Sequence, residues 1–223
     1  IYAPTSERVS SEAEKGILEF ISRKSQTNEQ WACIDTFEKQ NIGDDAFLNL
    51  LVGFAAAERN LYVFSEKHVR KALGKGFAAF SKELADELTF AAYYCLAKAL
   101  LGTGNDEEGH QAGLDALSQL VDTERKSLLW EGYAFGKVLG TALIARLFYD
   151  YQHPEWALPL LKNLEGDPPP EWGYRPLGRY WEDLARCHIA MGNYKEGVEA
   201  LKKSLGYEGY NQYDRLALHV EIG

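Results

Sequence analysis

Residues 180–205 of the chain read YWEDLARCHIAMGNYKEGVEALKKSL, and this stretch decides the fold class. In its first half the apolar side chains recur at steps of three and four residues, which places them along one side of a helix. These residues are Leu184, Cys187, His188 and Met191. A second stripe of the same kind follows, and its members are Val198, Leu201 and Leu205. The stretch therefore predicts two amphipathic helices.

The residues between the two stripes predict a tight connection. Gly192 ends the first helix at little cost, because glycine adopts the left-handed backbone conformation that closes a helix. Asn193 comes next, and Glu196 three residues later predicts a capping box at the start of the second helix. Ala185 and Gly197 are small where the two helices would cross. We therefore expect an antiparallel helix hairpin.

This hairpin resembles one tetratricopeptide repeat, the unit of a family of helical repeat proteins. The characteristic places of the repeat are filled by Trp181, Leu184, Ala185, His188, Gly192, Tyr194, Gly197, Leu201 and Ser204. His188 stands where an aromatic residue is usual, and we expect it to pack in that place. The resemblance implies protein binding rather than chemistry. It also implies neighbouring repeats, because one repeat cannot bury its apolar face alone.

Two earlier segments are interpreted as degenerate copies of the hairpin. The members of the first are Tyr93, Leu96, Ala97, Leu100, Gly104, Ala112 and Ala116. The members of the second are Gly136, Leu139, Gly140, Leu143, Ala157, Leu161 and Leu164. Matching them to the repeat requires about three extra residues in the first turn and about five in the second. We recognise no copy before residue 60.

Residues 5–153 contain no proline, and their apolar residues keep helical spacing. The expected helices span 7–23, 28–40, 44–59, 64–79, 82–101, 106–121, 124–150, 154–164, 177–191, 194–205 and 211–221. We expect one all-α domain over residues 1–223, a right-handed superhelical stack of antiparallel helix hairpins (a tetratricopeptide-like α-solenoid). Within it, residues 1–60 form helices of unclear repeat type and residues 61–223 form irregular hairpins.

Charge and composition exclude several classes of function. The formal net charge is −9, which argues against nucleic acid and against an anionic membrane as partners. The longest apolar run, residues 46–57, is too short to cross a bilayer. The three cysteines are widely spaced, which favours small buried thiols in a reducing compartment over disulfides or zinc. We therefore expect a cytoplasmic protein.

The polar residues predict no catalytic site, no metal site and no cofactor. Asp44–Asp45 and residues 106–108 are acidic, and both groups stand at expected helix starts, where acids favour the helix dipole. They are also the residues that a metal-dependent all-helical enzyme would use. The histidines do not occur at ligand spacing on one helix. We therefore interpret the acids as helix-start residues.

The remaining candidate is a binding groove. In stacks of this type the first helix of each hairpin lines the concave face, so residues beside its packing positions would point into the groove. The candidate partner-binding residues are Arg179, Glu182, Arg186, Lys98, Tyr94 and Lys137, with Thr141 at the place that follows Lys137. Arginine forms bidentate hydrogen bonds with a carboxylate, which favours an acidic or carboxylate-ended peptide as the ligand. Solvated helix charges are the alternative interpretation.

The expected function is a non-catalytic, protein-binding adaptor or scaffold that holds a partner protein or peptide in a concave helical groove. One alternative is a regulatory or sensor domain cut from a larger multidomain protein, because the chain starts without Met. The other alternative is the metal-dependent all-helical enzyme.

Overall fold

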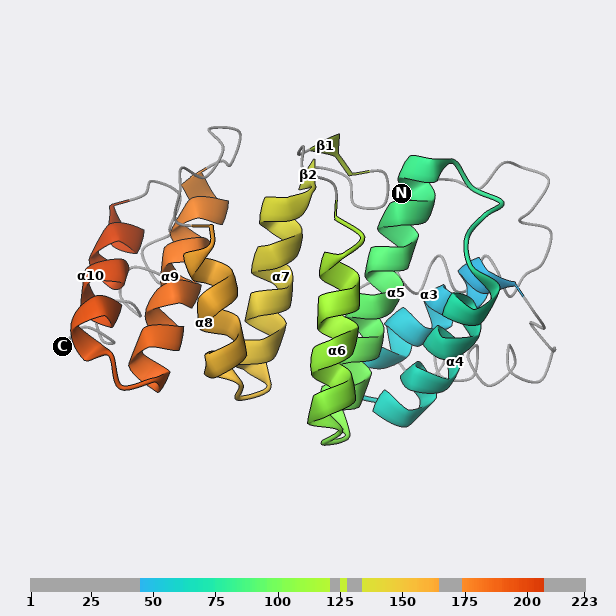
Figure 1. Ribbon diagram of the computed structural model, residues 1–223, viewed down its shortest axis with the longest axis horizontal. Helices are drawn as coiled ribbons and strands as arrows, with labels where there is room; N and C mark the ends of the chain where they lie inside the picture. Colours follow the sequence, from blue (N-terminus) through green and yellow to red (C-terminus); the bar gives the residue numbers. More distant parts are fainter. Residues whose placement is uncertain (1–44, 121–124, 128–133, 165–173, 207–223) are drawn as a thin grey trace. The chain divides into compact units, whose positions relative to one another are not determined.

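The computed structural model describes residues 45–120, 125–127, 134–164 and 174–206. These residues contain eight helices and a two-residue antiparallel strand pair (Figure 1). The helices are α3 (Ala46–Ala57), α4 (Tyr62–Lys75), α5 (Lys82–Gly102), α6 (Asp106–Leu117), α7 (Lys137–Asp150), α8 (Pro154–Lys162), α9 (Tyr174–Ala190) and α10 (Tyr194–Leu205). The expected helices over 7–23, 28–40 and 211–221 lie outside the described residues.

The chain divides after Lys137 into two compact units. In the N-terminal unit α3 packs on α4, and α5 packs on α6. In the C-terminal unit α9 packs on α10, and the ring of Phe148 in α7 meets that of Trp156 in α8 at 5.5 Å between centroids. An all-helical fold with adjacent helices in pairs is therefore confirmed. The expectation of a single domain over residues 1–223 stays a prediction.

One turn joins the two helices of every described hairpin. It contains a residue with positive φ, between 61° and 78°, and the residue after it donates its backbone N–H to the carbonyl five residues earlier at 2.8–3.0 Å. The residues with positive φ are Asn60, Gly104, Gln152 and Gly192. The donor and acceptor pairs are Leu61 to Ala56, Asn105 to Leu100, His153 to Phe148, and Asn193 to His188. This geometry is the Schellman motif that closes helices.

The donor residue of the turn also starts the second helix. Asn193 has φ −87° and ψ 61° and makes no side-chain capping bond, so the expected capping box with Glu196 is wrong. The turn holds the Asn193 backbone outside the extended region in which an N-cap side chain reaches back to the helix. Side-chain caps do form at two other helix starts: Asp45, one of the acids expected there, accepts from the N–H of Leu48, and Ser81 accepts from that of Leu84.

Because the four turns are the same, they fix which residues are equivalent between hairpins. The α5–α6 and α7–α8 turns need no extra residues, so the expected insertions are wrong. In α7 the register moves by five residues from the expected one: Ala145, not Gly140, corresponds to Ala185 of α9. The α3–α4 hairpin has the same turn, although it lies before every copy that the sequence pattern identifies. We call α3, α5, α7 and α9 the first helices.

Small residues stand at the helix crossing of each hairpin and are buried. In the first helices they are Gly53, Ala97, Ala145 and Ala185, and in the second helices Ser65, Gly109, Ala157 and Gly197. A Cβ at Gly197 would lie 2.6 Å from Cγ1 of Ile189, and one at Gly53 would overlap Cγ2 of Val69. Close approach of the two helices therefore depends on these positions.

Neighbouring hairpins pack in the same order within each unit. The second helix of one hairpin contacts the first helix of the next, α4 on α5 and α8 on α9. The first helices also meet, because α3 contacts α5 and Arg146 of α7 reaches Asp183 of α9. Each unit thus presents two neighbouring first helices.

The segment before α7 differs from the expected long helix over 124–150. Strands β1 (Arg125–Lys126) and β2 (Ala134–Phe135) pair there, and α7 begins only at Lys137. Phe135 is buried with its ring 5.6 Å from that of Phe90, and Ser127 donates to the buried carboxylate of Glu87 at 2.9 Å. These contacts with α5 stabilise the strand pair, although the spacing of the apolar residues predicted a helix here.

Candidate binding surface on the first helices

A basic residue recurs at one position of the first helices. The shared turn makes Lys98 of α5, Arg146 of α7 and Arg186 of α9 equivalent, and Phe54 occupies the same position in α3. Each of the three cations is partly exposed and lies within 4 Å of a carboxylate. The repeated position is therefore a candidate contact for a charged ligand within each unit.

In the N-terminal unit Lys98 pairs with Glu58, which follows the last residue of α3. The distance between Nζ and Oε1 is 2.7 Å, and the side chain of Lys98 is 18% exposed. Tyr94, one turn earlier in α5, stacks on Phe90 with 6.4 Å between ring centroids. Both predicted residues therefore lie on the same stretch of α5, where an ion pair orients Lys98.

In the C-terminal unit Glu182 is buried and lies within 4 Å of two arginines of its own helix. Arg186 lies 2.6 Å from one carboxylate oxygen, and Arg179 lies 3.9 Å from the other. The side chain of Arg179 is half exposed, whereas that of Glu182 is 7% exposed. The three residues predicted on α9 therefore form one cluster, with the carboxylate beneath the two guanidinium groups.

The next residue, Asp183, extends the cluster to α7. Its carboxylate lies 3.9 Å from Arg146, and Arg146 also lies 3.7 Å from Asp150. Burial raises the pKa of Asp183 from 3.8 to about 6, and the positive charge of Arg146 opposes this shift. Asp183 is therefore a carboxylate whose charge is costly in the folded protein.

The distances separate two kinds of contact. Arg186 is hydrogen-bonded to Glu182, whereas the contacts of Arg146 and Arg179 at 3.7–3.9 Å exceed hydrogen-bond length. Ion pairing still holds these two guanidinium groups beside the carboxylates. A guanidinium carries five N–H donors in a planar fork that matches a carboxylate. Arg146 and Arg179 are therefore placed to take a ligand carboxylate.

The sequence pattern predicted Lys137, and not Arg146, as the α7 residue of the binding groove. Lys137 is exposed at the first residue of α7, and Thr141 is buried at the place that Trp181 holds in α9. The misplacement arose because Gln152, not a glycine, takes the left-handed position of this turn. The spacing of Ile144, Ala145 and Phe148, which repeats that of Leu184, Ala185 and His188, is the signal that identifies the register.

Other reactive side chains are packed. Burial raises the pKa of the Cys95 and Cys187 thiols to about 12, so both are protonated near neutral pH. His188 is buried, as expected for a residue in the aromatic place. Across the described ranges, no group of three or more His, Cys, Asp or Glu side chains could hold a metal ion. No described helix is long and apolar enough to cross a membrane.

No model of a known protein family matches this sequence, and no curated protein matches it significantly.

Proposed function

We propose that the protein is a non-catalytic adaptor or scaffold of the tetratricopeptide-like type, a right-handed superhelical stack of hairpins located in the cytoplasm. Its first helices would hold a partner protein or peptide. The observation that supports this most is the recurrence of one hairpin with one turn, small residues at the crossing and a cation at a fixed place on three first helices.

The chemistry of the first helices favours a ligand with a carboxylate. Arg146 and Arg179 come from neighbouring first helices of the C-terminal unit, and each is held by an internal acid at a distance that leaves hydrogen bonds unmade. A ligand carboxylate would complete those bonds bidentately. A charge-assisted hydrogen bond of this kind contributes about 1.5–3 kcal/mol.

The test is the binding of a fluorescent library of acidic peptides, with free and amidated C-termini, to the full chain. Arg179→Gln is expected to weaken binding about tenfold, the equivalent of one such bond. Arg179 is half exposed, so the variant is expected to fold. Lys202→Gln is the matched control, because Lys202 is an exposed cation paired with Glu199 on α10.

Equal affinity for the Arg179→Gln and Lys202→Gln proteins would contradict the proposed surface. Elemental analysis of the purified protein discriminates the enzymatic alternative, because a stoichiometric bound metal would favour it over an adaptor.

A further inference from the structure

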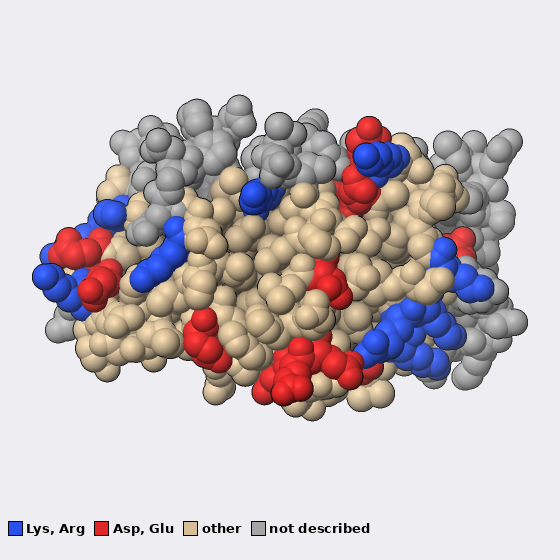
Figure 2. Space-filling model, in the orientation of Figure 1, with Lys and Arg blue, Asp and Glu red and all other residues tan. Residues whose placement is uncertain are grey.

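The exposed side of α4 carries a row of lysines that the first-helix surface does not use. Lys67, Lys71 and Lys75 are four residues apart, so they share one face, and all three are exposed. Figure 2 shows the resulting group of basic side chains over α4. The row extends over roughly 12 Å of helix axis. It is a concentrated positive stripe on a chain whose net charge is −9.

The three lysines of this row repel one another, because they are four residues apart on one helix face. Like charges four residues apart destabilise a helix by about 0.2–0.5 kcal/mol per pair. Arg70, on the same helix, pairs with Glu66 at 2.8 Å and with Glu108 at 2.7 Å. Arg70 thus ties α4 to α6, and the lysines add mutual repulsion to this face. A ligand of opposite charge would relieve that repulsion.

An apolar depression of about 490 Å³ adjoins the row at the start of α4. Its lining residues are Asn60, Leu61, Tyr62, Val63, Phe64, Lys67 and Thr103. Two apolar side chains remain open to solvent at its rim, Val63 at 73% and Leu61 at 39%. Lys67 belongs both to the lining and to the row, so the depression and the positive stripe form one continuous surface.

The hairpin turn gives the depression a fixed shape. The hydroxyl of Tyr62 donates to Oδ1 of Asn60 at 2.8 Å. A Cβ at Gly102 would overlap the Tyr62 ring, so the ring lies directly against the last residue of α5. The ammonium group of Lys67 lies 5.9 Å from the ring centroid of Phe64. The surface is therefore formed before any ligand arrives, which lowers the entropic cost of binding.

We propose that this α4 surface binds a partner segment in which a large apolar residue adjoins a run of acids, with the apolar side chain in the depression and the acids along the lysine row. The stripe is short, whereas nucleic-acid binding draws on many phosphate contacts and requires no apolar depression. The α4 surface belongs to a second helix, so this proposal is independent of the first-helix surface.

The test uses the full chain and two fluorescent synthetic peptides, with one Trp either before or after a run of glutamates. One of the two is expected to bind, and a peptide with Ser in place of Trp is expected to bind at least tenfold more weakly. Val63→Asp and Lys71→Glu are each expected to weaken binding about tenfold, because they place negative charge at the apolar rim and in the row. Both residues are exposed, so both variants are expected to fold.

Lys202→Glu is the matched charge reversal on α10, and Arg179→Gln reports on the first-helix surface. Neither is expected to change the affinity for the Trp–Glu peptide. The proposal is overturned if neither peptide binds, or if Lys71→Glu and Lys202→Glu bind equally well. Binding of phosphatidylserine vesicles without peptide binding would assign the surface to a membrane. Lys71-dependent self-association in sedimentation, again without peptide binding, would assign it to a second copy.

Discussion

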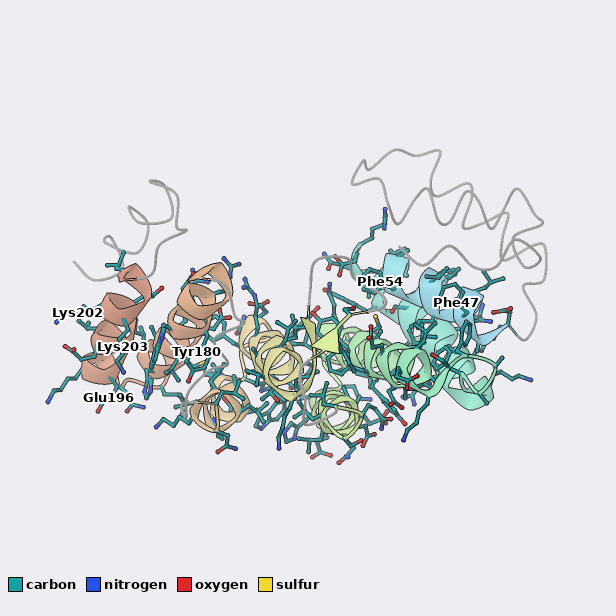
Figure 3. The ribbon with its side chains drawn as sticks, turned by 90° about the horizontal axis from the view of Figure 1, so that it is seen from above. Phe47, Phe54, Tyr180, Glu196, Lys202 and Lys203 are labelled. Carbon is teal, nitrogen blue, oxygen red and sulfur yellow. The ribbon has the colours of Figure 1, made fainter. Side chains whose placement is uncertain are left out.

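Helices α3 and α9 share a backbone frame and differ in the chemistry of one face. The positions held by Phe47, Leu50, Leu51 and Phe54 in α3 are held by Arg179, Glu182, Asp183 and Arg186 in α9. Figure 3 shows Phe47 and Phe54 on α3. Both helices end in a Schellman turn and place a small residue at the helix crossing.

The two helices show which features every hairpin shares and which positions vary in residue type. The turn and the small crossing residues recur, so they define the fold of each hairpin. The four compared positions of the first helix are all apolar in α3 and all charged in α9. The same hairpin backbone therefore accommodates either apolar or charged residues at these positions.

The largest expected difference between the two helices is in pH dependence. Asp183 has a folded pKa of about 6 against 3.8 for the unfolded chain, so the folded state retains a proton that the unfolded state loses. Stability from this group is therefore full below pH 4 and falls as the pH rises to about 6, by about 3 kcal/mol. Asp183→Asn should remove that fall in urea unfolding experiments across this pH range.

The matched control is Asp150→Asn, which removes an exposed carboxylate from the same Arg146. It is expected to retain most of the fall. An Asp183→Asn protein whose stability follows the wild-type pH profile would show that the charge of Asp183 is not costly in the fold.

The crossing residues are expected to respond alike in the two hairpins. Gly53→Ala and Gly197→Ala should each lower the unfolding free energy by about 1–3 kcal/mol, because the added methyl group meets Val69 or Ile189. Gly74→Ala is the control, since a Cβ there meets nothing within 4 Å. It should stabilise the protein by up to about 1 kcal/mol. A gain in stability for Gly53→Ala would show that the crossing of α3 and α4 does not require a small residue, unlike the account given for α9 and α10.

A smaller effect is expected at the turns. Gln152 has a φ of 68°, which costs a residue with a side chain about 1 kcal/mol relative to glycine. Gln152→Gly should therefore raise the melting temperature, and Gly192→Ala should lower it, as measured by circular dichroism. Asn60→Gly should give a smaller gain, because asparagine tolerates this conformation and the change removes the bond from the Tyr62 hydroxyl. If Gly192→Ala has no effect, the turn does not depend on its left-handed residue.

The sequence predicted the helical class and the α9–α10 hairpin because there glycine and large apolar residues mark the turn and the stripes. It missed the α3–α4 hairpin, where Asn60 replaces glycine and Asn49 stands at the place of Trp181. It also misplaced α7, because the left-handed position of Gln152 is set by the hydrogen bond of the turn rather than by residue type. Strand β2 depends on the contact between Phe135 and Phe90, which joins residues distant in sequence.

The sequence also predicted only part of the candidate surface, because only the α9–α10 hairpin has a register that is clearly marked by its residues. Arg179, Glu182 and Arg186 belong to the well-marked hairpin, and the structure places them together. Arg146 required the correct register of α7. The carboxylates that orient these arginines, including Asp183 from the neighbouring first helix, could not be assigned without the packing of α7 near α9.

The central claim is that one turn builds all the described hairpins, and amide hydrogen exchange measured by NMR tests it directly. The backbone amides of Leu61, Asn105, His153 and Asn193 each donate to a carbonyl five residues earlier. All four are expected to exchange as slowly as amides inside the adjoining helices. Protection at Asn105 and Asn193 with open-chain exchange at Leu61 and His153 would contradict the account, because the hairpins without a turn glycine would then not share the motif.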